Sequence, residues 1–412
     1  MTDKPALPPI LSQRSLRQET LGQETAPNKT KQPVRVLTLT PFYPSESDDA
    51  AGCFVSEPVG ALAKTGVVNT VLAVQPFYRG RLRANPKATA QWLRYFSLPG
   101  GFGLPGAGAF LFARIVSRVR ELQRTGQIDL VHAHAALPCG HAAMLLSAEL
   151  KLPYVVSVHG LDAFSTEQVR GRASDWARRI SLRVYQASRR VICISERVRE
   201  QVLEGTGQTT RTSVVYNGVD PEIFLPGSEP AGELSVLSVG NLIPIKGHDF
   251  LIRAVAELSP GFKQLTLDII GDGVERQRLQ QLAQDLQISQ RVRVHGRRSR
   301  AEVAEAMRHC TVFALPCRYE GLGCVYLEAM SSGKPVIGCR GQGIAEIIRQ
   351  GANGFLVGPD NEKELALALG MLLRDEGLRR RIGIAARDTI LDRLTLARQA
   401  EDLARIYRES LA

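Results

Sequence analysis

Short runs of apolar, mostly β-branched residues recur along the chain, separated by longer stretches in which apolar residues return at helical spacing. Runs of this kind, without polar alternation, are typical of parallel strands that helices cover on both faces. We expect such strands at residues 34–40, 67–74, 128–131, 153–158, 191–194, 213–216, 234–239, 265–270, 291–295, 311–315 and 335–338. Strands that alternate with helices in this order predict the α/β class, with Rossmann-like parallel sheets.

The 412 residues exceed what one hydrophobic core usually organises, so we expect two domains. Residues 1–33 are rich in Pro, Gln, Thr and charge and show no periodicity, which predicts a disordered tail. The first domain is expected at residues 34–216 and the second at residues 234–392. Between them, residues 217–233 form a linker in which Pro and Gly interrupt the pattern.

The densest candidate chemistry lies in residues 314–346. A buried strand stopped by Pro316 leads into a polar loop, then into a helix that begins near Gly323, and then into another strand. Ligands of parallel sheets bind at the carboxyl ends of strands, so the loop Glu320-Gly321-Leu322-Gly323 lies at the expected mouth of a site. Its two glycines leave backbone N–H groups uncovered at a helix start, where an anion is favoured.

Two glutamates of this stretch are candidates for ligand binding. Glu320 and Glu328 are eight positions apart, one in the loop and one in the helix. At about 1.5 Å per helical residue they stand roughly 10 Å apart and cannot both serve one reacting atom. Their placement suits the two ends of one elongated ligand. The alternative is that both are solvated glutamates near the ends of a helix.

Composition restricts the class of protein. Hydrophobic residues make up 44% and charged residues 23% of the chain, which is typical of a soluble globular protein. No apolar run approaches the roughly 18 residues of a membrane span, and the N-terminus lacks an apolar signal core. We therefore expect a cytoplasmic protein. Seven cysteines without a C-x-x-C pair favour reduced thiols over a disulfide framework.

The net charge of +11 is concentrated on two expected helices of the first domain. Seven arginines lie between residues 167 and 190, and four more lie in a helix that we expect to begin at Phe110, after a Gly/Pro-rich segment. No nucleic-acid motif accompanies them, so no nucleic-acid partner is expected. One interpretation is an anionic membrane surface or a diphosphate lipid, with the protein peripheral on the inner face of the cell membrane. The other is a solvated basic face.

Three histidines near expected strand ends are further candidates. His132 and His134 share one strand face and have the chemistry of metal ligands, but no third ligand is indicated nearby, and no D-x-D pair occurs in the chain. We therefore expect no metal site. His159 closes the next strand and is followed by Gly160. A lone histidine is usually structural, but this position at a strand's carboxyl end favours a functional role.

The motif E-G-x-G-x4-E-A that begins at Glu320, followed by G-K-P-V-I and then by G-x-G-x-x-E ending at Glu346, resembles the retaining glycosyltransferases of family 4. His159-Gly160-Leu161-Asp162 resembles the family's H-G-x-D, and residues 217–220 its N-G-V-D turn. The resemblance covers the chain from about residue 34 to its end. It implies the GT-B fold, in which two Rossmann-like domains face a cleft and a C-terminal helix, here residues 393–412, crosses back to the first domain.

The resemblance also implies a nucleotide-diphosphate sugar as donor substrate, with no metal and no other cofactor. The groups that would receive the diphosphate are Lys246, Gly52 and the backbone N–H groups of Gly321, Leu322, Gly323 and Cys324. Asn241 stands where the family commonly has an arginine, and its amide offers only a neutral hydrogen bond.

The same resemblance implies roles for the acidic residues and the histidine. Glu320 would hold the donor sugar and Glu328 the ribose. His159 would meet the sugar from the opposite wall of the cleft, with Asp162 beside it on the acceptor side. Retention without an evident nucleophile implies that the acceptor attacks the same face of the sugar, with the diphosphate oxygen taking its proton.

Together these features predict a retaining glycosyltransferase that moves a hexose-type sugar from a nucleotide-diphosphate sugar to a saccharide or lipid-linked saccharide acceptor. Within the family, residues 41–57 and the stretch His132-Ala133-His134 are most similar to enzymes of bacterial surface-polysaccharide and exopolysaccharide assembly, including the teichuronic-acid type. The alternative is a non-catalytic protein, either a nucleotide-sugar binder, for which Asn241 is the main hint, or a membrane-associated scaffold that uses the basic helices.

Overall fold

The computed structural model describes residues 33–46, 48–80, 90–99, 101–164, 172–227 and 233–412. The tail predicted at residues 1–33 lies outside these ranges except for Pro33, as do residues 228–232 of the predicted linker.

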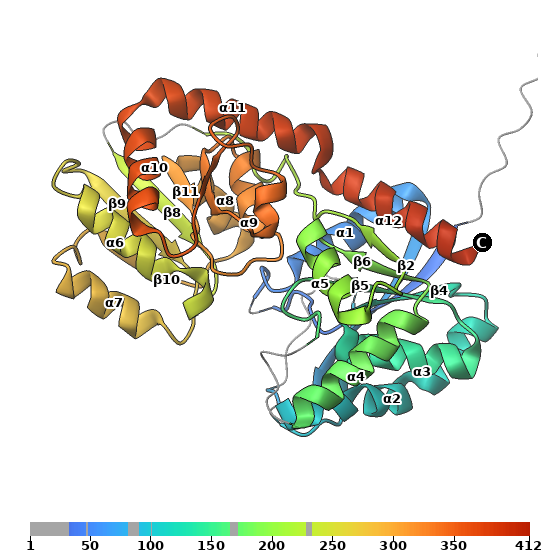
Figure 1. Ribbon diagram of the computed structural model, residues 1–412. Helices are drawn as coiled ribbons and strands as arrows, with labels where there is room; N and C mark the ends of the chain where they lie inside the picture. The colour runs from blue at the N-terminus through green and yellow to red at the C-terminus, as the bar shows by residue number, and fades with distance from the viewer. Residues whose placement is uncertain (1–32, 47, 81–89, 100, 165–171, 228–232) are drawn as a thin grey trace, which may run out of the picture. The chain divides into compact units, whose positions relative to one another are not determined.

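The first half of the described chain forms a seven-stranded sheet in the order β3-β2-β1-β4-β5-β6-β7. Figure 1 labels β2, β4, β5 and β6 of this sheet. Every pair of neighbouring strands is parallel. The strands are β1 (Val34–Thr40), β2 (Val67–Pro76), β3 (Gln91–Tyr95), β4 (Leu130–His134), β5 (Tyr154–Val158), β6 (Arg190–Cys193) and β7 (Thr212–Val214). The helices are α1 (Cys53–Leu62), α2 (Leu104–Arg124), α3 (His141–Leu150), α4 (Arg172–Ala187) and α5 (Glu196–Thr206), with single turns η1 (Ala63–Thr65), η2 (Gly101–Gly103) and η3 (Ala136–Gly140).

The second half forms a six-stranded sheet of described residues in the order β10-β9-β8-β11-β12-β13, again parallel throughout. The strands are β8 (Leu234–Val239), β9 (Leu265–Ile270), β10 (Val292–Gly296), β11 (Val312–Ala314), β12 (Val336–Cys339) and β13 (Phe355–Val357). The helices are α6 (His248–Leu258), α7 (Arg276–Asp285), α8 (Arg300–His309), α9 (Cys324–Ser331), α10 (Glu362–Arg374), α11 (Glu376–Arg393) and α12 (Leu396–Leu411), with the turns η4 (Pro244–Lys246) and η5 (Gly343–Glu346).

Two parallel sheets whose described strands mostly alternate with helices confirm the predicted α/β class. The central strands β4 and β5 are buried along their whole length, including the polar residues His132, His134 and Ser157 that interrupt their apolar character. The bounds of the eleven expected strands differ from the observed ones by no more than three residues. Because both sheets are parallel, the loops that follow their strands gather at one edge of each sheet.

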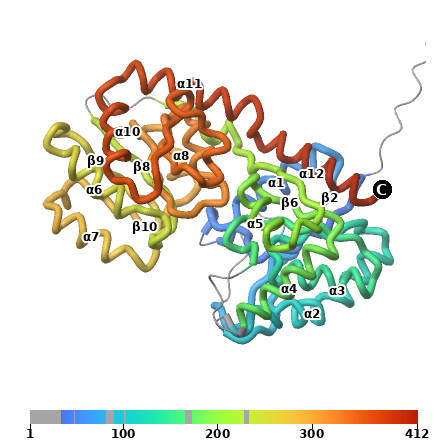
Figure 2. Tube along the Cα trace, viewed as in Figure 1, coloured from blue at the N-terminus to red at the C-terminus, as the bar shows by residue number. Residues whose placement is uncertain are grey.

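The last helix packs against the first sheet. Buried Leu403, Ala404 and Tyr407 of α12 share one hydrophobic cluster with Val36 of β1 and Val155 of β5. Figure 2 follows α11 from the helices of the second sheet into α12, which lies beside the first. The carboxyl-terminal helix therefore closes one face of the amino-terminal sheet.

The segment before α2 differs from the prediction. The sequence predicts a Gly/Pro-rich loop and a helix from Phe110, but residues 91–95 form β3 and α2 begins at Leu104. β3 is a partly exposed edge strand without an apolar run, so the pattern does not reveal it. Gly108 belongs to α2, where a Cβ would lie 2.5 Å from the Cβ of His141 on α3. This glycine serves close helix packing and not a loop.

Candidate functional site

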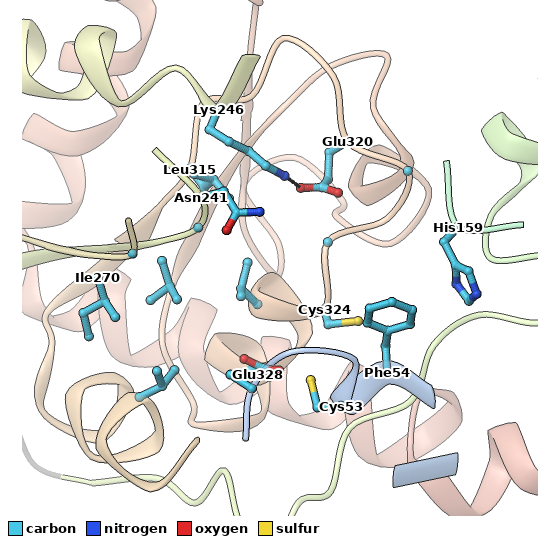
Figure 3. Close-up of a pocket in the computed structure, with 18 of the residues that line it drawn as sticks. Cys53, Phe54, His159, Asn241, Lys246, Ile270, Leu315, Glu320, Cys324 and Glu328 are labelled. Carbon is cyan, nitrogen blue, oxygen red and sulfur yellow. Dashed lines mark hydrogen bonds and ion pairs between the residues drawn. The ribbon is translucent and has the colours of Figure 1, made fainter. Parts of the chain in front are cut away.

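A cavity of about 510 Å³ lies at the carboxyl ends of strands from both sheets. One wall follows the strands of the second sheet, with Gly240 after β8, Gly271 after β9 and Leu315 after β11. The opposite wall comes from the first half of the chain and includes Phe54 at the start of α1 and His159 after β5 (Figure 3). A volume of this size is typical of a small-ligand site.

Most of the residues predicted from the sequence meet in this cavity. Its lining includes His159, Asp162, Asn241, Lys246, Glu320, Gly321, Gly323, Cys324 and Glu328. Gly52 and Leu322 are not among the described residues that line it. The side chain of Leu322 is fully buried in the hydrophobic core. Gly52 precedes α1 with φ 75°, where a Cβ would lie 2.4 Å from the backbone nitrogen of Tyr43, so this close approach requires glycine.

Lys246 and Glu320 form an ion pair within the cavity, with Nζ 2.5 Å from Oε2 (Figure 3). Lys246 ends the turn η4, and Glu320 lies in the loop between β11 and α9. The two side chains are only 17% and 16% exposed. Burial lowers the pKa of Lys246, but the Glu320 carboxylate outweighs burial, so the net shift is upward and the ammonium stays charged. The sequence predicts both residues in the site but not that they pair.

Glu328 is buried, with 2% of its surface exposed. Its Oε1 lies 2.5 Å from Nη1 of Arg300, whose Nη2 lies 2.7 Å from Oε1 of Glu57 on α1. The Arg300 guanidinium also lies over the ring of Phe224, 4.8 Å from its centroid. Glu328 Oε2 is buried without a hydrogen-bond partner among the described residues. One oxygen of this carboxylate is therefore held by protein, and the other has no partner among the described residues.

Sequence reasoning missed Arg300 and Glu57. The signal at Ser299 and Glu302 is that of a capping box, which the structure contains at the start of α8. This box explains the helix start but says nothing about the arginine between its members. Burial raises the pKa of Glu57 and Arg300 opposes the rise without cancelling it. One guanidinium thus pairs with two carboxylates, the buried Glu328 and the partly buried Glu57.

His159 lies beside Phe54, with ring centroids 4.7 Å apart, and its ring stacks on that of His134, which with His132 is buried. Its Nε2 lies 3.0 Å from Nδ1 of His134, and its Nδ1 is buried without a described partner. Burial lowers the pKa of His159 to about 3 and that of His132 to about 3. His132 uses both ring nitrogens, toward Tyr407 and Ser157, each at 2.7 Å. The imidazoles are therefore neutral near pH 7.

Asp162 shapes the turn that carries His159. Its Oδ1 accepts a hydrogen bond of 2.8 Å from the backbone N–H of His159, whereas Oδ2 is buried without a described partner. Burial raises the pKa of Asp162 to about 6, and backbone hydrogen bonds only partly offset that rise. A carboxyl group with this pKa is close to its own titration point at neutral pH.

Comparisons with known proteins agree with this geometry. The family model described as Glycosyltransferase Family 4 matches residues 54–223, and the model described as Glycosyl transferases group 1 matches residues 220–389. An uncharacterized glycosyltransferase of Methanocaldococcus jannaschii is 34% identical over 258 residues, which cover 62% of this chain and 68% of the relative.

The chain belongs to the family 4 glycosyltransferases. A D-inositol 3-phosphate glycosyltransferase of Stackebrandtia nassauensis is similar over nearly its whole length, 27% identical over 97% of this chain and 96% of the relative. This assignment supports a glycosyltransferase enzyme over the scaffold alternative.

Solved structures establish the GT-B fold of this glycosyltransferase. The sucrose-phosphate synthase of Thermosynechococcus elongatus superposes with a TM-score of 0.75 at 20% identity, covering 91% of this chain and 98% of that one. Anabaena HepE, in complex with UDP and glucose, superposes with a TM-score of 0.71 at 22% identity, covering 90% and 98%. The GT-B fold implied by the motifs is thus confirmed.

Among the described helices of the glycosyltransferase, none combines the length and the apolar character that crossing a membrane requires.

Proposed function

We propose that this glycosyltransferase transfers a hexose from a nucleotide-diphosphate sugar to a saccharide or lipid-linked saccharide, with retention of configuration and without a metal. The observation that carries the proposal is the cavity, which offers a cation, a glycine-rich helix start and a half-satisfied carboxylate on one wall and a neutral histidine on the other. These groups match the charge pattern of a nucleotide diphosphate joined to a neutral sugar.

The diphosphate would bind at Lys246 and the start of α9. Helix α9 begins at Cys324, and Gly323 has φ 82°, so backbone N–H groups are uncovered beside the Lys246 ammonium. A bound diphosphate would compete with Glu320 for that ammonium. Release from the ion pair would leave the Glu320 carboxylate to accept hydrogen bonds from sugar hydroxyls. Asn241, on the same wall, would add a neutral hydrogen bond to the phosphates (Figure 3).

The ribose and the sugar would lie at opposite ends of the cavity. Glu328 Oε2, which has no described partner, would accept from the ribose hydroxyls. His159 Nδ1 would face the donor sugar from the other wall. In the transfer, the bond from the anomeric carbon to the diphosphate breaks and the bond to the acceptor oxygen forms on the same face. The acceptor's proton passes to the departing diphosphate oxygen.

Names of related proteins support this class of donor without fixing the base. One relative is a GDP-mannose-dependent mannosyltransferase of Mycolicibacterium smegmatis, whereas Anabaena HepE has been solved in complex with UDP-glucose. The acceptor class we propose belongs to surface-polysaccharide or exopolysaccharide assembly.

The proposal is tested first by thermal shift of the purified protein with UDP, GDP, ADP and their sugars, each with and without EDTA. We expect one base to stabilise the protein, and the stabilisation to survive chelation. The preferred donor is then incubated with saccharide acceptors, and the anomeric configuration of the product is read by NMR. Glu320→Gln should lose transfer, whereas Glu362→Gln, at the partly exposed start of α10, should keep it. No shift with any nucleotide, or an inverted product, would refute the proposal.

We also propose that the enzyme is peripheral on an anionic membrane. Exposed aromatic side chains gather near the starts of α2 and α4, where Phe102 is 78% and Trp176 51% exposed, and where Phe96 packs on Phe110 with centroids 5.0 Å apart. The arginines of both helices are exposed along the same elements: Arg114, Arg118, Arg120, Arg124, Arg178, Arg179 and Arg183. Apolar side chains next to a basic helix face suit the interface of an anionic bilayer.

Vesicle flotation tests this second proposal. The protein should float with vesicles that contain phosphatidylglycerol and not with pure phosphatidylcholine, and high salt should release it. The double variant Phe102→Ser/Trp176→Ser should bind at least several-fold more weakly. Val274→Ser in the second domain, where Val274 is 83% exposed, is the matched control and should bind normally. Equal binding of all three proteins would contradict a role for the aromatic surface.

A further inference from the structure

Glu346 closes the G-x-G-x-x-E motif, and the proposed function gives it no role. Its carboxylate lies at the start of α5, a helix of the first half of the chain. Oε2 accepts a hydrogen bond of 2.8 Å from the backbone N–H of Glu196, and Oε1 accepts one of 2.9 Å from the backbone N–H of Arg197. The hydroxyl of Tyr216 donates a third, at 2.9 Å. The motif residue is therefore bound to a different domain from its own.

Helix α5 already has a side-chain cap of its own. Ser195 is the N-cap residue, and its Oγ accepts from the backbone N–H of Val198. Glu346 takes the two preceding N–H groups, so the first turn of α5 is completed by a carboxylate from the second half of the chain. An anion at this end of a helix is also favoured by the helix dipole. The contact thus joins the two halves and is more than a local cap.

The segment that carries Glu346 also holds the loop of Glu320. Gln342 Oε1 accepts from the backbone N–H of Glu320 at 2.9 Å, and the N–H of Gly343 donates to the carbonyl of Glu320 at 3.1 Å. A Cβ on Gly343 would lie 1.8 Å from the carbonyl oxygen of Gly321, so this segment and the loop are in direct backbone contact. A shift of one displaces the other.

The same loop is held from its other side by residues around α5. Ser195 Oγ donates to the carbonyl of Gly321 at 2.6 Å, and the Tyr319 hydroxyl donates to Gln201 of α5 at 2.9 Å. The Glu320 loop therefore lies between the Glu346 segment and α5, and Glu346 joins these two supports to each other.

We infer that Glu346 is a positioning residue: by binding the start of α5 it fixes the loop that carries Glu320, so that Glu320 takes its reactive position only while the two domains are engaged. The inference rests on the proposed function, because it assigns Glu320 to the donor sugar. The reason is geometric. Small displacements of a positioned group lower the rate of the chemical step while leaving nucleotide contacts elsewhere in the cavity in place.

The test compares Glu346→Ala, Glu346→Gln and Tyr216→Phe with Glu364→Gln. Glu364 is the matched control, since it also accepts a backbone N–H, that of Gly358 at 2.7 Å, but within its own domain. With the preferred donor, kcat should fall about tenfold to a hundredfold in Glu346→Ala, less in Glu346→Gln, and least in Tyr216→Phe, in line with the bonds each removes. The Kd of the nucleotide alone should stay within about threefold of the wild type, and the control should match the wild type.

A second readout does not depend on activity. By hydrogen exchange and mass spectrometry, peptides that cover residues 317–323 and 195–198 should exchange faster in Glu346→Ala than in the wild type or in Glu364→Gln. Unchanged exchange at residues 317–323, or a normal kcat in Glu346→Ala, overturns the inference. If the wild type transfers no sugar from any donor, the proposed function fails on its own, and the exchange experiment still decides whether Glu346 orders the loop.

Discussion

Compared with the wild type, the variant Asp162→Asn should become more stable as the pH rises from acid to neutral. Burial raises the pKa of Asp162 from the usual 3.8 to about 6. The folded state therefore keeps the proton up to about pH 6, whereas the unfolded chain releases it near 3.8. Between these values the folded state binds more protons, so its free energy of unfolding falls as the pH rises. The contribution of Asp162 to stability is complete below 3.8 and is lost as the pH passes 6.

The size of the effect follows from the pKa difference. At about 1.4 kcal/mol per pH unit, a rise from 3.8 to about 6 corresponds to about 3 kcal/mol in total. Most of this change develops between pH 4 and pH 8. Asparagine has no such titration. It keeps an acceptor for the N–H of His159, and any cost of placing its NH₂ group where Oδ2 is buried does not depend on pH. The free energy of unfolding of the variant, minus that of the wild type, should therefore increase by most of the ~3 kcal/mol between pH 4 and pH 8.

Urea denaturation at several pH values measures this difference. Both tryptophans, Trp92 and Trp176, lie in the first half of the chain, so their fluorescence reports the domain that contains Asp162. Asp129→Asn is the control of opposite sign. Although burial acts to raise it, the pKa of Asp129 is lowered overall, because hydrogen bonds from Arg35 outweigh the effect of burial. Compared with the wild type, Asp129→Asn should therefore become less stable as the pH rises. The reasoning would be refuted if the difference in free energy of unfolding between Asp162→Asn and the wild type stayed constant from pH 4 to pH 8.

Two further predictions concern the paired charges of the cavity. Lys246→Met should weaken binding of the donor nucleotide about tenfold to a hundredfold, as measured by calorimetry, because a charge-assisted contact to phosphate is lost. The control Lys263→Met, on the exposed surface, should bind the nucleotide normally. Equal affinities of the two variants would contradict the diphosphate role of Lys246. Arg300→Met should lower the free energy of unfolding by about 3 kcal/mol, because Glu57 and Glu328 lose their shared cation, and adding Glu57→Gln should restore part of it. If denaturation followed by circular dichroism shows that the free energy of unfolding falls by less than about 1 kcal/mol, the two carboxylates are solvated or protonated.

The position of the site could be predicted from local patterns. Apolar runs mark strands that helices cover on both faces, and the loops that follow parallel strands must gather at one edge. Lys246, Glu320 and His159 each follow an expected strand, and the structure brings all three to one cavity. The edge strand β3 could not be predicted in this way, because its pattern carries no apolar run.

What the sequence by itself determined is the two-sheet α/β architecture, the loops that form the site, and the family motifs within them. Only the tertiary structure decided which polar groups pair: Lys246 with Glu320 across 74 positions, Glu346 with the start of α5 across 150, and Arg300 with Glu57 across 243. The physical reason is that hydrophobic periodicity records which face of an element is buried. A charged side chain finds its partner only after separate elements have packed, and that partner sets its pKa and its role.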